Sequence, residues 1–227
     1  MKANCASVRR ARPLLGTLVE IRVPASREAE RATERAFAAI ERVHRAMSAQ
    51  DGTSDIARLR AGRRLALDPW TRRVLDRAEE IRLATDGLFD CAACGFALDG
   101  IAKGFAVDRA VEALQLAGIG AGVVNAGGDL RVFGEAYEEV YARPPQRPDT
   151  LVCLGCVRDA AVATSAAALL VDPRPSGRAR PAIGATVIAA DCMTADALTK
   201  PCLLEPQGAQ ELAARFCAHA FLIGADG

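Results

Sequence analysis

The apolar positions of the chain follow two spacings, and these predict a mixture of helices and strands. Over residues 26–47 the apolar side chains Ala36, Ile40, Val43 and Met47 recur with the 3.6-residue period of a helix. After a turn at its start, the segment 13–23 alternates apolar and polar residues, as in a strand with one buried face. Similar patterns predict helices at 55–59, 68–85, 101–114, 192–198 and 211–216, and strands at 151–157, 160–163, 185–189 and 220–223.

Residues that start or break helices set several boundaries. Asp68 followed by Pro69 is the expected beginning of the second long helix, because the aspartate caps free N–H groups and proline suits the first turn. We expect Ser26 to cap the first helix and Thr194 to cap the helix near the C-terminus. Pro201 is expected to interrupt that last helix.

Polar segments separate these elements without dividing the chain. The proline-rich stretch 135–149 is expected to be an exposed connection. Thr164 and Ser165 are expected to open an alanine-rich helical stretch. We find no internal repeat and no linker. The mixture of helices and hairpin-like strands predicts an α+β fold, a single compact domain over residues 1–227 with mixed or antiparallel sheets flanked by helices.

Composition narrows the classes of function. The chain has 227 residues with 29 basic and 28 acidic side chains, so a general nucleic-acid surface is not expected. We expect no membrane span, since no apolar run approaches the roughly 20 residues that a spanning helix needs. The first residues lack the apolar stretch of a signal peptide and Cys5 is not in a lipid-anchor context, so we expect a cytoplasmic protein.

Eight cysteines raise the question of a metal site. Cys91 and Cys94 form one CxxC pair, and Cys153 and Cys156 form another, so four thiolates could hold a structural zinc. The two pairs are far apart in the sequence, and the second lies in a predicted strand, where its side chains point to opposite faces. We therefore expect free thiols, with a non-enzymatic module stapled by zinc as an alternative.

Two glycine-containing turns carry the candidate chemistry. The residues 125–129, Asn-Ala-Gly-Gly-Asp, join two apolar runs as strand, bend and strand, and a hairpin with a bulge is the plain structural interpretation. Lys103 follows Gly100 at the start of a predicted helix, where free N–H groups and a mobile ammonium suit a phosphate. A solvated surface lysine is the alternative, and the segment does not have the P-loop pattern.

The order of these motifs resembles the ApbE family, the FAD:protein FMN transferases. The segment 100–108, Gly-Ile-Ala-Lys-Gly-Phe-Ala-Val-Asp, is nearly letter for letter the family's Gly-Ile-Ala-Lys-Gly-Tyr-Ala-Val-Asp, and the turn at 125–129 is a second hallmark. The resemblance covers almost the whole chain. Its other segments, in chain order, are Leu15-Gly16-Thr17, Ser54-Asp55-Ile56, Asp86-Gly87-Leu88-Phe89-Asp90, Ala163-Thr164-Ser165, Val171-Asp172-Pro173-Arg174 and Ala195-Asp196-Ala197-Leu198.

The resemblance implies an enzyme that binds FAD and Mg²⁺ and passes FMN to a threonine hydroxyl of an acceptor flavoprotein, with release of AMP. Such a transfer needs cationic and N–H donors around the pyrophosphate and little covalent chemistry from the protein. Carried over by position, Asp196 and Lys103 are the catalytic candidates, and Gly100, Asp196 and Thr199 are the metal-site candidates. The FAD-binding candidates are Leu15, Gln50, Leu88, Phe89, Asp90, Lys103, Asp108, Asn125, Gly127, Gly128, Asp129, Thr164, Ser165 and Leu170.

Two positions depart from the family's pattern beside the expected metal. The family has a threonine four residues after the aspartate, where this chain has Lys200, and Thr199 comes one residue, or about 100° of helix, too early to replace it. The family's histidine is Leu169 here. An ammonium at Lys200 would occupy the metal's place or repel it, so an FAD-binding homologue without turnover is an alternative to an active transferase. The connection 90–100 is shorter than in the family, which makes this a compact form.

Overall fold

A computed structural model describes residues 6–63, 66–147, 149–166, 170–174 and 183–224 of the 227. Its strands are β1 (Ser7–Leu14), β2 (Thr17–Pro24), β3 (Gly122–Ala126), β4 (Asp129–Phe133), β5 (Tyr137–Ala142), β6 (Val152–Arg158), β7 (Ala161–Ala166), β8 (Gly184–Ala189) and β9 (His219–Ile223). Its helices are α1 (Ala29–Met47), α2 (Asp55–Arg60), α3 (Pro69–Ala84), α4 (Ala102–Leu116), α5 (Cys192–Leu204) and α6 (Ala209–Ala214), with a 3₁₀ turn, η2 (Pro206–Gly208).

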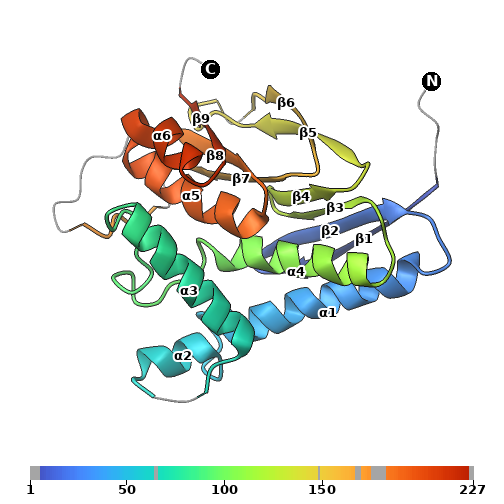
Figure 1. Ribbon diagram of the computed structural model, residues 1–227, viewed down its shortest axis with the longest axis horizontal. Coiled ribbons are helices and arrows are strands. Elements are labelled where there is room, and N and C mark those ends of the chain that lie inside the picture. Colours follow the sequence, from blue (N-terminus) through green and yellow to red (C-terminus); the bar gives the residue numbers. More distant parts are fainter. Residues whose placement is uncertain (1–5, 64–65, 148, 167–169, 175–182, 225–227) are drawn as a thin grey trace.

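Within the described ranges, seven strands form one antiparallel sheet in the order β1-β2-β3-β4-β7-β8-β9. Helices α4 and α5 cover one face of this sheet, and α1 packs against α4 (Figure 1). The small sheet β5-β6 packs on the other face, on β3 and β4. The expected α+β domain with antiparallel sheets and flanking helices is confirmed.

Two apolar cores hold these three layers together. Val124 lies in the larger core between the sheet and the helices, whereas its neighbour Val123 lies in the smaller core under β5 and β6. Successive residues of a strand point to opposite faces, so one strand supplies both cores. On the helical side of the sheet, the start of α4 therefore lies next to both α5 and the start of β4.

Several predicted boundaries are confirmed and others are wrong. Asp68 caps α3 as expected, because its Oδ1 accepts the N–H of Trp70 at 2.8 Å. Ser26 is not the cap of α1, which begins after Glu28 without a side-chain cap. Thr194 is not the cap of α5 either, because Asp191 accepts the N–H of Thr194 and so occupies that position itself.

Helix α5 continues through Pro201, contrary to the prediction. The residues after the proline, Cys202 and Leu203, are buried in the larger core. Burial of this apolar end offsets the cost of a proline inside a helix, which is about 3 kcal/mol. The prediction of a helix opening at Thr164 and Ser165 is also wrong for the described residues, because both belong to strand β7; residues 167–169 lie outside the described part.

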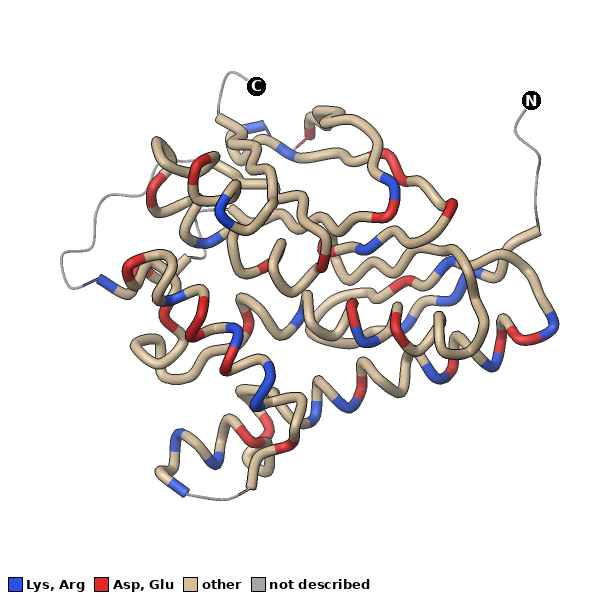
Figure 2. Tube along the Cα trace, viewed as in Figure 1, with Lys and Arg blue, Asp and Glu red and all other residues tan. Residues whose placement is uncertain are grey.

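Two strands were not predicted because their sequences are strongly polar. Strand β1 carries three arginines, and Arg9 and Arg12 form ion pairs with Glu20 of β2 and Glu34 of α1. Such charged side chains are common on edge strands. Strand β5 lies inside the stretch expected to be a connection. Figure 2 shows basic and acidic residues interspersed along α1 and α3.

Candidate functional site

Two clefts adjoin on the helical side of the sheet, and Lys103 and Asp99 line both of them. The first cleft, of about 270 Å³, is lined by the β1–β2 turn, the end of α1 and Gln50. The second cleft, of about 460 Å³, is lined by the segment after α3, the end of β7 and Lys200. The second cleft alone falls within the range of roughly 300–1,000 Å³ that is usual for ligand sites.

Most of the predicted FAD-binding residues line one of these clefts. Leu15 and Gln50 line the first cleft. In the β1–β2 turn, Leu15 has a φ of 55° and Gly16 a φ of 72°, as a two-residue hairpin turn that matches the strand twist requires. The predicted FAD-binding residues that line the second cleft are Leu88, Phe89, Asp90, Lys103, Thr164, Ser165 and Leu170, and the metal-site candidate Gly100 lines it as well.

The turn at Gly127 and Gly128 positions the partner of Lys103. Both glycines have positive φ, and the register pairs Ala126 with Asp129, so they form a two-residue hairpin loop without a bulge. A Cβ on Gly127 would stand 2.3 Å from Thr17 Oγ1, so the turn requires glycine to approach β2. Asn125 Oδ1 accepts the N–H of Gly128 at 2.9 Å. These contacts fix the start of β4, where Asp129 lies.

Lys103 and Asp129 form an ion pair between α4 and β4. Lys103 Nζ lies 3.0 Å from Asp129 Oδ2, and the aspartate is only 2% exposed. Burial acts to lower the pKa of Lys103, but the attraction of Asp129 and Asp196 outweighs it, so the pKa is raised. Burial, together with repulsion from Asp196, raises the pKa of Asp129 to about 7 against the opposing effect of both lysines.

Asp196 is held where α5 crosses the start of α4. Its Oδ2 accepts the N–H of Gly104 at 3.0 Å. A Cβ on Gly104 would meet the carbonyl oxygen of Cys192 at 2.1 Å, so only glycine allows the two helices to approach this closely. The carboxylate is 2% exposed and therefore has little contact with water.

Lys200 lies one helical turn after Asp196, and its side chain reaches back to that residue. Its ammonium donates to the carbonyl oxygen of Asp196 at 2.8 Å and forms an ion pair with Oδ1 of the same residue. Its aliphatic chain crosses Gly100, where a Cβ would stand 2.9 Å from Lys200 Cε. Thr199 Oγ1 lies 2.7 Å from the carbonyl oxygen of Asp196 and 2.9 Å from Ser165 Oγ.

These contacts do not fit the divalent cation that the resemblance implies. Both oxygens of Asp196 already have donors, one from Gly104 and one from Lys200. The ammonium of Lys200 binds one expected ligand, Asp196, while its aliphatic chain lies on the other, Gly100. Among the residues that the structure describes, no group of three or more His, Cys, Asp or Glu side chains is arranged to hold a metal.

Other predicted residues lie away from the two clefts. Asp108 is buried on α4, where its carboxylate accepts the N–H groups of Cys192 and Met193, both at 2.9 Å, and a bond from Arg131 at 2.8 Å. It therefore joins α4, α5 and β4. Asn125, Gly127, Gly128 and Asp129 are absent from both cleft linings, and Leu169 lies outside the described residues.

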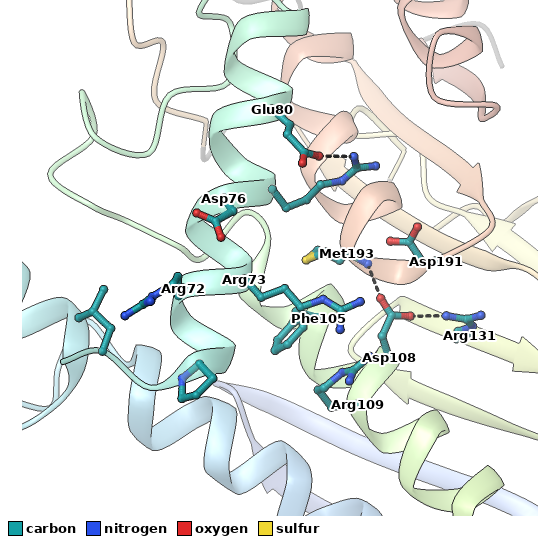
Figure 3. A pocket seen from close by; sticks show the side chains of 13 residues that line it. Arg72, Arg73, Asp76, Glu80, Phe105, Asp108, Arg109, Arg131, Asp191 and Met193 are labelled. Atoms are coloured by element: carbon teal, nitrogen blue, oxygen red, sulfur yellow. Dashed lines mark hydrogen bonds and ion pairs between the residues drawn. The ribbon is translucent and has the colours of Figure 1, made fainter.

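Asp108 lines a third cavity, of about 630 Å³, between α3, α4 and α5 (Figure 3). Figure 3 shows Asp108 between the backbone of Met193 and the side chain of Arg131. Arg77 on α3 forms an ion pair with Glu80 at 2.8 Å. Although this cavity is larger than either cleft, Asp108 is the only one of the FAD-binding candidates in its lining, so we take the two clefts as the candidate site.

Sequence reasoning missed some residues of the clefts. His44, which was not among the candidates, is exposed and lines the first cleft at the end of α1. Cys91 and Cys94 line the second cleft, where burial raises the pKa of Cys91 to about 12. Cys153 and Cys156 are exposed on β6, so the two CxxC pairs do not form a four-cysteine group.

One comparison with known proteins identifies a family for this sequence. The sequence model of the ApbE family matches residues 15–96 and 92–222. A search of curated protein sequences finds no match. In the described part of the chain, no helix is long and apolar enough to cross a membrane.

Solved structures share the fold over nearly their full length. The flavin transferase ApbE of Vibrio cholerae has a TM-score of 0.80 at 19% identity, covering 96% of this chain and 93% of that one. The ApbE protein of Thermotoga maritima has a TM-score of 0.81 at 22% identity, covering 98% and 96%. The apo flavinyl transferase ApbE of Pseudomonas stutzeri has a TM-score of 0.79 at 17% identity, covering 97% and 92%. These likenesses concern the fold; the family match over nearly the whole sequence shows that the chain belongs to the ApbE family.

Proposed function

We propose that the protein is a flavin transferase, which moves FMN from FAD to a threonine hydroxyl of an acceptor flavoprotein and releases AMP. The observation that carries this proposal is that two adjoining clefts meet at Lys103 and together contain most of the residues nominated for FAD. The structural relatives from Vibrio cholerae and Pseudomonas stutzeri are named as flavin and flavinyl transferases.

The chemistry of the two clefts suits an extended dinucleotide. The second cleft has an apolar wall, to which Leu88, Phe89 and Leu170 contribute, next to the polar groups of Asp90 and Thr164. The first cleft has apolar surface from α1 and the β1–β2 turn. FAD can place one ring system in each cleft, which brings its phosphates to the junction. Lys103 lines both clefts there and is 30% exposed, so its ammonium can contact a phosphate.

The reaction balances with these groups. The threonine Oγ forms a bond to the phosphorus of the FMN half, the bond from that phosphorus to the bridging oxygen breaks, and AMP leaves with that oxygen. The hydroxyl proton passes to water or to a base of the complex. Lys103 offsets the negative charge of the phosphates, and Asp196 positions Lys200 and the start of α4. Because the donors around Asp196 do not fit a metal, the proposal has no metal-dependent step.

The test is the covalent flavinylation of a peptide that carries an acceptor threonine. The protein, FAD and the peptide are incubated, and the peptide mass is measured. We expect a gain equal to one FMN group and a matching release of AMP. An unchanged peptide mass, when a family member of verified activity labels the same peptide, would exclude the proposal.

Two variants connect the activity to Lys103. Lys103→Met should lower the transfer rate by roughly 100-fold, the usual effect of removing one charged group that stabilises a transition state. Because this leaves Asp129 buried without its ion-pair partner, the double variant Lys103→Met/Asp129→Asn serves to keep the fold. Arg72→Met, an exposed residue outside both clefts, is the matched control and should retain the rate.

An FAD-binding protein without turnover is the second candidate, and one observation favours it. Lys200 binds Asp196 where the resemblance expects a metal, and position 169 lacks the family's histidine. The same incubation separates the two candidates. If the protein retains FAD through gel filtration but leaves both the peptide and the FAD intact, it is an FAD-binding protein without turnover.

A further inference from the structure

We propose that the ammonium of Lys200 takes the place of a divalent cation, so that the second cleft, where it meets the first, binds the phosphoanhydride of FAD without a metal ion. The proposal rests on the proposed function only in taking FAD as the ligand. It is carried by the position of one side chain between Asp196 and Gly100.

A lysine balances the charge of each of two buried carboxylates at the site. Asp129 and Asp196 are each 2% exposed, and each has an ammonium next to it, Lys103 for the former and Lys200 for the latter. A buried carboxylate requires a positive partner, because the interior solvates an unpaired charge poorly. In this chain both partners are side chains. A divalent ion added beside two ammonium groups would be repelled by both of them.

Lys200 is held at two points along its side chain. The ammonium has two bonds to one residue, to the carbonyl oxygen and to the carboxylate of Asp196. Its aliphatic chain lies on Gly100, where even a methyl group would come within 2.9 Å of Cε. The side chain is 18% exposed and lines the second cleft. Lys200 is therefore held along its aliphatic chain by Gly100 and at its ammonium by Asp196, and its side chain lines the second cleft.

Lysine is rare in this chain. The chain has 29 basic side chains, of which 26 are arginine and three are lysine. Two of the three lysines are Lys103 and Lys200, each paired with a buried carboxylate at the site. Lysine carries a compact point charge, whereas the arginine guanidinium is a broad planar fork. A compact cation is the group that can replace a metal ion in a narrow space.

The experiment measures metal and FAD binding without any acceptor. Mn²⁺ is titrated into the wild type, Lys200→Thr and Lys200→Met, and bound Mn²⁺ is followed by electron paramagnetic resonance. FAD affinity is measured by fluorescence in Mg²⁺ and in EDTA. We expect no bound Mn²⁺ in the wild type and FAD affinities that agree within about twofold, well below the tenfold that 1.4 kcal/mol would give. Lys200→Thr should bind Mn²⁺ and prefer FAD in Mg²⁺ by roughly tenfold.

The controls keep the result decisive. Lys200→Met retains the length of the side chain without its charge, so it should also bind Mn²⁺ if the ammonium excludes the metal. Arg72→Met should behave as the wild type, and circular dichroism checks that every variant is folded. Bound Mn²⁺ in the wild type, or a tenfold loss of wild-type FAD affinity in EDTA, would overturn the proposal, as would Lys200 variants that bind no Mn²⁺. If flavin transfer fails, the Mn²⁺ titrations still decide this proposal independently.

Discussion

The contact of α4 with α5 at Gly104 gives a prediction whose size follows from the structure. Replacing Gly104 with alanine adds one methyl group that would lie 2.1 Å from the carbonyl oxygen of Cys192 and 2.9 Å from Asp196 Cβ. The first of these partners is backbone, which cannot rotate away. The two helices would have to separate by roughly 1 Å in a close-packed interior.

The expected cost combines three contributions. Overpacking of a core costs about 1–3 kcal/mol. Weakening the bond from the Gly104 N–H to the buried Asp196 carboxylate costs about 1.5–3 kcal/mol, since one partner is charged. Alanine returns about 1 kcal/mol because it favours the helix more than glycine does. We therefore expect Gly104→Ala to lower the free energy of unfolding by about 1.5–5 kcal/mol.

Urea unfolding followed by circular dichroism measures this difference. The matched control is Gly52→Ala, where an added Cβ meets nothing within 4 Å and φ does not lie in the left-handed region. The control should change the free energy of unfolding by less than about 0.5 kcal/mol. Equal stabilities of the two variants would refute the close approach of α4 and α5 that positions Asp196.

Two further predictions concern the buried groups around the site. Asp108→Asn should lower the free energy of unfolding by about 2–4 kcal/mol, since it removes the charge that binds two backbone N–H groups and Arg131; urea unfolding tests this, and an unchanged midpoint would contradict it. In a thiol-labelling experiment at pH 8, exposed Cys153 should react with iodoacetamide in the native protein, whereas Cys192, whose pKa burial raises well above its ordinary value, should react only after unfolding. Peptide mass spectrometry measures both sites, and comparable native rates would show that Cys192 is accessible.

The sequence predicted an element correctly where its local signals and its tertiary packing favour the same structure. Asp68 and Pro69 predicted the start of α3, and the adjacent glycines at 127 and 128 predicted the β3–β4 turn. Strands β1 and β5 were not predicted, because their side chains are strongly polar and their stability comes from ion pairs and from pairing with the strands that follow them, β2 and β6. The course of α5 beyond Pro201 depends on burial, which a local rule does not include.

For the candidate site, too, the sequence indicated some residues, and the fold was needed to find their partners. The segment 100–108 indicated that Lys103 is important, but only the fold shows that its partner is Asp129 from β4. The substitution at position 200 was evident in the sequence, but two outcomes were open, occupation of the metal's place or repulsion of the metal. The structure shows the Lys200 ammonium bound to Asp196 and its aliphatic chain on Gly100, which supports our proposal that it occupies the metal's place. Asp108 belongs to the same sequence motif as Lys103, but it lies on another face of α4 and lines the third cavity instead of the two clefts.

A crystal structure of the protein soaked with FAD and Mg²⁺ tests the central claim most directly. The account predicts FAD along both clefts, with its phosphates in hydrogen-bond contact with Lys103, and Lys200 still bound to Asp196 with no metal between them. FAD bound in the third cavity, or a Mg²⁺ ion on Asp196 with Lys200 turned away, would contradict it.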